Sequence, residues 1–138
     1  MSTLPTHIKR FCRDILIKYP LMKKELAALE EERKAVAEAV STATWKEPAR
    51  IKAIGDRTAA QAFKLLRLSE QWQQVHFYVK AVEDLLEYLD EEKKELVKLR
   101  FFNNYPPWKT AQALNMSERA VYRWQDEILT LLAHRLGL

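Results

Sequence analysis

The sequence predicts an all-α protein, with a long antiparallel, coiled-coil-like helical hairpin followed by a C-terminal helix-turn-helix. Three observations support this fold class. The 138 residues include only 2 glycines, whereas the tight turns of sheet proteins depend on glycine. Leucine and valine recur at alternating steps of three and four through the middle of the chain, the period of paired helices. Near the C-terminus, Asn115 and Ser117 suit a sharp turn and a helix cap between two amphipathic stretches.

The first part of the chain predicts two helices, at residues 6–19 and 21–40. Apolar residues in both recur at three- and four-residue steps, which is the amphipathic helical period. Pro20 is expected to end the first helix. In the second helix, Arg33 interrupts the apolar seam. Residues 41–56 contain serine, threonine, proline and glycine, so they predict a connector.

Residues 58–89 predict a third helix with the most regular pattern in the chain. Thr58 and Gln61 fit a capping box at its start. The apolar seam covers about three and a half heptads and comprises Leu65, Leu68, Trp72, Val75, Val79, Val82, Leu86 and Leu89. Because a helix this long cannot bury its seam alone, we expect it to pair with residues 21–40 in a hairpin. Residues 1–89 are thus predicted to be a helical assembly region, with a homodimer as the preferred state.

Residues 90–138 form the second predicted domain, a DNA-binding module. We expect helices at residues 90–102, 108–114 and 118–136. Two prolines at positions 106 and 107 separate the first two of these helices, and Ser117 caps the last.

The last two helices have the spacing of a helix-turn-helix. Ala111 is small enough to let two helices cross closely, and Asn115 tolerates the left-handed backbone of a sharp turn. Trp108 is expected to lie in the protein core rather than to stack on bases. The predicted core of the motif comprises Ala111, Leu114, Asn115, Met116, Val121 and Trp124.

An outward face remains at the start of the last helix. Arg119 and Arg123 lie one turn apart, and each could form a bidentate pair with guanine. Lys109 lies at the start of the preceding helix, where phosphate contacts are typical. The same spacing also fits ordinary helix packing with a solvated face. The predicted DNA-binding residues are Ser117, Glu118, Arg119, Tyr122, Arg123 and Lys109.

Residues 85–136 resemble region 4 of sigma-70-type factors, in which a helix rich in leucine leads into a helix-turn-helix. The stretches VYRWQDEILTLL (121–132) and GDRTAAQAFKLL (55–66) are more specifically similar to RinA/ArpU-type phage transcriptional regulators. The resemblance covers roughly residues 50–138. It implies a phage- or prophage-encoded regulator that activates late genes for packaging, morphogenesis and lysis. Its expected partners are double-stranded DNA and, as a further candidate, host RNA polymerase.

Two other functions remain open at this point. A small terminase subunit also combines a helix-turn-helix with oligomerising helices, but it recognises packaging DNA and assembles into rings. A sigma-like module would bind RNA polymerase and contact DNA little. An enzyme is not expected, because the three histidines lie far apart without metal-ligand spacing. No cofactor or metal is expected either.

Charge and cysteine content indicate which partners and which cellular compartment to expect. Lysine and arginine outnumber aspartate and glutamate 23 to 19, which permits a nucleic-acid partner. Residues 81–99 carry seven acidic and three basic side chains, so we expect this block to face away from DNA. The single cysteine, Cys12, excludes an internal disulfide and favours a reducing, intracellular compartment. The resemblance to phage regulators implies that this compartment is the cytoplasm of a bacterial host. No apolar run approaches the length of a membrane span.

Overall fold

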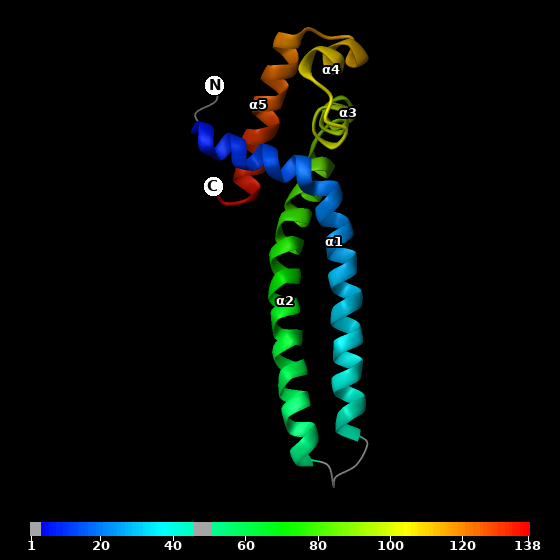
Figure 1. The fold of residues 1–138 in the computed structure, drawn as a ribbon. Coiled ribbons are helices and arrows are strands. Elements are labelled where there is room, and N and C mark those ends of the chain that lie inside the picture. The colour runs from blue at the N-terminus through cyan, green and yellow to red at the C-terminus, as the bar shows by residue number, and fades with distance from the viewer. Residues whose placement is uncertain (1–3, 46–50) are drawn as a thin grey trace. The chain divides into compact units, whose positions relative to one another are not determined.

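The computed structural model describes residues 4–45 and 51–138. All regular elements within these residues are helical, so the all-α prediction and its two long N-terminal helices are confirmed (Figure 1). The elements are α1 (Thr6–Trp45), α2 (Ile51–Tyr88), α3 (Glu91–Val97), the π-helical turn η2 (Lys98–Phe102), α4 (Pro107–Leu114) and α5 (Glu118–Arg135). None of the helices in the described part of the chain is long and apolar enough to cross a membrane.

The chain divides into two compact units that share both long helices. The terminal unit combines Met1–Met22 with Tyr78–Leu138, and the hairpin unit is Lys23–Phe77. The predicted domains divide the chain elsewhere, between residues 89 and 90. The difference arises because both ends of the assembly region, the start of α1 and the end of α2, contribute side chains to the core around α5.

The predicted break at Pro20 is wrong, because α1 continues through this residue to Trp45. A proline in a helix interior removes one main-chain hydrogen bond and costs about 3 kcal/mol. Pro20 itself is exposed, whereas Leu16 and Tyr19 before it and Leu29 after it are buried. Packing on both sides therefore maintains the helix despite the missing bond.

The predicted connector at residues 41–56 is also largely wrong. α1 extends to Trp45 and α2 begins at Ile51, so Thr58 lies inside α2 and does not cap it. Residues 46–50 of the predicted connector lie outside the described residues. Each weak helix former lowers helix stability by only about 1 kcal/mol. The stability of the two long helices outweighs this cost.

In the hairpin unit, α1 and α2 run antiparallel and side by side (Figure 1). Leu29 and Leu68 are buried. Arg33, which interrupts the seam in the sequence, places its guanidinium carbon 5.0 Å from the centre of the Trp72 ring. This cation–π contact accommodates the polar position. The seam of this unit is therefore covered within a single chain.

The terminal unit has a core drawn from most of its helices. Two ring contacts attach α1 to it: the Tyr19 ring centre lies 5.1 Å from that of Phe102, and Phe11 lies 6.2 Å from Tyr78. The start of α1 is thus part of the same core as α5. Core side chains with no more than 2% exposure are Cys12, Leu16, Val79, Val82, Leu85, Leu96, Val97, Phe101, Thr110, Val121, Ile128, Leu129, Leu132 and Ala133.

Candidate nucleic-acid interface

α3 and η2 lead the chain into α4, and their junction differs from the single helix predicted at residues 90–102. Asp90 caps α3 by accepting a hydrogen bond from the Lys93 N–H at 3.0 Å. The helix then widens, because the Asn103 N–H donates to the Lys98 carbonyl at 2.8 Å, five residues back. Such a π-type turn adds a residue per turn. It accompanies the burial of Phe101 and the stacking of Phe102 on Tyr19.

The double proline begins α4 and does not disrupt it. Pro106 has an extended backbone and precedes the helix, and Pro107 occupies its first turn. A proline there loses no helical hydrogen bond. The buried Thr110 strengthens this start, because its Oγ1 donates to the Pro106 carbonyl at 3.2 Å.

The turn between α4 and α5 has the predicted backbone geometry. Asn115 adopts φ 56° and ψ 48°, in the left-handed region. The Met116 N–H donates to the Ala111 carbonyl at 3.0 Å and thereby ends α4. Ser117 then caps α5, since its Oγ accepts from the Ala120 N–H at 3.1 Å. These bonds hold the two helices on either side of a three-residue turn.

Burial of the predicted core residues varies around this turn. Ala111 and Val121 are buried, Leu114, Met116 and Trp124 are half-buried, and Asn115 is exposed. Lys93 lies against Trp124, with its Nζ 5.8 Å from the ring centre. The expectation for Trp108 is wrong, because its side chain is 59% exposed. Trp108 lies in the first turn of α4, and that helix buries Thr110 and Ala111 instead.

The six predicted DNA-binding residues are all exposed. Five lie at the start of α5 or its cap, and the sixth lies on α4. Lys109 is positioned by Tyr105, since its Nζ lies 4.2 Å from the centre of that ring. The exposed residues are Ser117, Glu118, Arg119, Tyr122, Arg123 and Lys109.

Two of the acidic residues of α5 form ion pairs with other helices. Lys9 of α1 places its Nζ 3.4 Å from the Asp126 carboxylate. Lys93 of α3 places its Nζ 3.2 Å from the Glu127 carboxylate. Two of the three negative charges on the helix are therefore neutralised by basic residues from outside it.

The basic residues of this surface have no such partners. Among residues 4–45 and 51–138, no ion pair involves Arg119, Arg123 or Lys109. Glu118 remains in the first turn of α5, where a carboxylate is favoured by the helix dipole. With Arg119 and Arg123 against Glu118, the start of α5 therefore presents a net positive charge to solvent.

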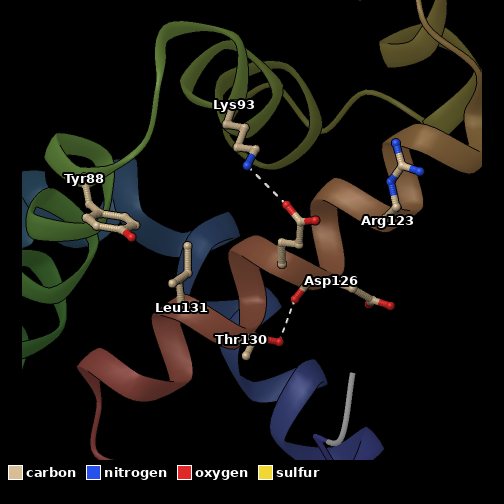
Figure 2. Close-up of a pocket in the computed structure, with 7 residues that line it drawn as sticks. Tyr88, Lys93, Arg123, Asp126, Thr130 and Leu131 are labelled. Atoms are coloured by element: carbon tan, nitrogen blue, oxygen red, sulfur yellow. Dashed lines mark hydrogen bonds and ion pairs between the residues drawn. The ribbon is translucent and has the colours of Figure 1, made fainter. Parts of the chain in front are cut away.

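A pocket of about 780 Å³ lies beside this surface (Figure 2). The Lys93–Glu127 ion pair crosses one side of it, and the Arg123 side chain points away from that pair. Thr130 donates from its Oγ1 to the Asp126 carbonyl at 2.8 Å. The pocket thus combines apolar surface with three charges that form ion pairs, those of Lys93, Asp126 and Glu127, and with the charge of Arg123, which is unpaired among the described residues. Its lining residues are Tyr88, Lys93, Arg123, Asp126, Glu127, Thr130 and Leu131.

Two further findings concern metal binding and the similarity of the chain to known proteins. Within the part of the chain that the structure describes, no group of three or more histidine, cysteine, aspartate or glutamate side chains is placed to hold a metal ion. Comparisons of the chain with protein-family models, curated proteins and solved structures give no match. The function is therefore inferred from the geometry and charge of α4 and α5.

Proposed function

We propose that the chain is a DNA-binding transcriptional regulator whose helix α5 enters the major groove. The observation that carries this proposal is the exposure of Arg119, Tyr122 and Arg123 on the first two turns of a capped helix. Helix-turn-helix proteins present the corresponding residues of their second helix to base edges. Two arginines one turn apart, with no carboxylate ion pair among the residues that the structure describes, supply the bidentate donors that recognise guanine.

Lys109 has a different role in this proposal. It lies on α4, the helix that would cross the DNA backbone, and its ammonium group is held over the Tyr105 ring. A phosphate contact from this position fixes the register of the protein on DNA but reads no sequence. In this proposal, α5 recognises the bases and α4 positions the protein on the DNA backbone.

The resemblance of residues 55–66 and 121–132 to RinA/ArpU-type regulators supports a more specific role. That role is activation of late phage or prophage genes in the cytoplasm of a bacterial host. The sigma region 4-like stretch at residues 85–136 includes the left-handed turn at Asn115 and the cap at Ser117. Both features suit the helix-turn-helix that the resemblance implies.

We extend the proposal to a homodimer formed through the hairpin unit. The predicted seam does not require a second chain, because α1 covers it. A different face of α2 exposes Phe63 by 73% and Leu66 by 57%, and both lie on the side of the helix away from Leu68 at 100° per residue. A second copy packed there would form a two-fold dimer. Two copies of α5 could then bind two half-sites.

The pocket beside Arg123 supports a second candidate function, the sigma-like module that binds RNA polymerase. Tyr88 is 68% exposed at its edge, and a protein partner could bury this ring. Binding to free duplex DNA separates the two candidates, because phosphate neutralisation gives a steep dependence on salt. A small terminase subunit would instead assemble into large rings, which light scattering detects.

Selection of bound sequences from a random pool of duplexes tests the proposed function. We expect the parent protein to enrich a defined site, and the double variant Arg119→Ala/Arg123→Ala to lose this enrichment while remaining folded. Lys24→Ala/Lys34→Ala is the matched control, since it removes two exposed positive charges from the hairpin unit. A parent protein that enriches no sequence would contradict promoter recognition.

A further inference from the structure

The pocket beside α5 is built from three helices of the terminal unit. Tyr88 ends α2, Lys93 belongs to α3, and the other lining residues lie on α5. Of these, Arg123, Glu127 and Leu131 follow one another at four-residue steps, so they lie along one face of the helix. The volume of about 780 Å³ falls within the range of about 300–1,000 Å³ that is typical of small-molecule sites. The pocket is therefore large enough to hold a small organic ligand.

The charges around the pocket leave one cation without a partner. Lys93 places its Nζ 3.2 Å from the Glu127 carboxylate, and Lys9, from outside the lining, neutralises Asp126 at 3.4 Å. Arg123 takes part in no ion pair among the described residues. When both ion pairs are counted, the pocket carries a single net positive charge. This charge matches a monovalent anion, and both carboxylates that would repel such an anion are already paired.

The part of the pocket farther along α5 is apolar. Tyr88 and Leu131 line it (Figure 2), and the Tyr88 side chain is 68% exposed, so most of its ring is uncovered. Leu131 lies two turns after Arg123, about 12 Å along the helix axis. A ligand that contacts both ends therefore needs an acidic group and an apolar body of about this length.

We propose that this pocket binds a small amphipathic carboxylic acid and that its binding regulates DNA recognition. The carboxylate would form a bidentate pair with the Arg123 guanidinium, and the apolar body would lie against Tyr88 and Leu131. The inference rests on the proposed function, because Arg123 is also one of the two arginines assigned to the bases.

Arg123 couples the two ligands because it can bind only one of them at a time. Its side chain is exposed and points away from the Lys93–Glu127 pair (Figure 2). Exposed side chains exchange rotamers within about a nanosecond, so the guanidinium can turn toward the pocket or toward DNA. A carboxylate that holds it at the pocket removes one base contact, and occupation of the pocket therefore weakens sequence recognition.

Titration with 4-phenylbutyrate, followed by the methyl resonances of Leu131, tests the site. We expect a saturable shift with a Kd on the order of a few millimolar. The uncharged analogue 4-phenyl-1-butanol should bind about tenfold more weakly, and Arg123→Gln should weaken binding of the acid by a similar factor. Arg10→Gln is the matched control and should bind like the parent, since it removes an exposed guanidinium that does not line the pocket.

Competition with DNA tests the regulatory part of the proposal. Saturating 4-phenylbutyrate should weaken binding of the parent to a selected duplex about tenfold, the loss expected for one base contact. Sodium acetate at the same concentration controls for ionic strength and should have no such effect. Tyr88→Ala should bind the duplex like the parent but lose its sensitivity to 4-phenylbutyrate, because Tyr88 lines the pocket and lies outside the proposed DNA-binding residues. Thermal melts establish that the variants are folded.

The outcomes separate this inference from the proposed function. Absence of a saturable Leu131 shift overturns the site and favours a protein partner in the pocket, as in the sigma-like candidate. Equal binding of the acid and the alcohol also overturns it. If the parent binds 4-phenylbutyrate and DNA together without loss of affinity, the regulation is overturned while the proposed function stands. If the parent binds no duplex, the proposed function fails, and the titration alone decides the carboxylate site.

Discussion

The terminal unit and the hairpin unit differ in how completely they bury their apolar side chains. Val121, Ile128 and Leu132 of the terminal unit have no exposed surface. Among the described side chains of the hairpin unit, only Leu29 and Leu68 are buried, and Phe63 is largely exposed. A unit with a closed core holds exposed polar residues in fixed positions, whereas a single helix–helix seam leaves apolar surface for a partner. In the proposed function, this difference suits the terminal unit to recognition and the hairpin unit to assembly.

The largest effect is expected from a charge placed in the closed core. Val121→Asp should unfold the terminal unit, because an unpaired buried carboxylate costs about 4 kcal/mol or more. Arg123→Ala, two residues away but exposed, should change stability by no more than about 0.5 kcal/mol. Thermal melts of both variants measure the difference. A melting curve of Val121→Asp that overlays the parent would show that the inward and outward faces of α5 are wrongly assigned.

A smaller effect, confined to assembly, is expected from substitutions on the face of α2 that exposes Phe63 and Leu66. Phe63→Ser/Leu66→Ser should convert a dimer into a monomer at tens of micromolar protein, because it removes the apolar surface that a second copy would bury. Melting of the terminal unit should be unchanged. Lys34→Ser, at an exposed site on α1, is the control and should remain dimeric. Light scattering that finds a strictly monomeric parent would contradict the dimer but not the hairpin.

The smallest effect concerns alkaline pH and only the terminal unit. Burial, and then the Glu83 carboxylate, raise the pKa of Tyr19 above its ordinary 10.0, and burial raises the pKa of Cys12 above 9.0. Since the folded state holds these protons more tightly, their stabilisation is complete below about pH 9 and is lost as pH rises through the raised values. We expect the free energy of unfolding in denaturant to fall as the pH rises above about 9.

Tyr19→Phe isolates the contribution of the phenol in that measurement. It keeps a ring against Phe102 but removes the titrating group, so the alkaline decline should become shallower. The exposed Tyr88→Phe variant is the control and should decline like the parent. Identical pH dependence of all three proteins would show that the Tyr19 environment does not couple to stability.

Features that depend on local spacing could be predicted from the sequence. The seam positions around Leu68 and Val82 follow from heptad periodicity, and every member of the seam is buried or half-buried in the structure. The turn at Asn115 and the cap at Ser117 follow from the chemistry of single residues. The exposure of Arg119 and Arg123 follows from the helical period once that cap is fixed.

Features that depend on contacts between distant segments could not be predicted in this way. The Lys9–Asp126 ion pair joins opposite ends of the chain, and no local pattern encodes it. The same packing of α1 explains why Pro20 does not end the helix. Gln125 is buried at 3% exposure, and its Oε1 has no hydrogen-bond partner among the described residues, although its residue type predicts a solvated position.

The most direct test of the proposed recognition surface compares Arg123→Ala with Lys109→Ala on a selected duplex and a scrambled duplex across a salt series. Arg123→Ala should lose about 1–3 kcal/mol on the selected duplex, with little change on the scrambled one. Lys109→Ala should weaken both duplexes about equally and reduce the salt slope by about one. Equal weakening of both duplexes by Arg123→Ala would contradict base recognition by α5 and make this arginine a phosphate contact.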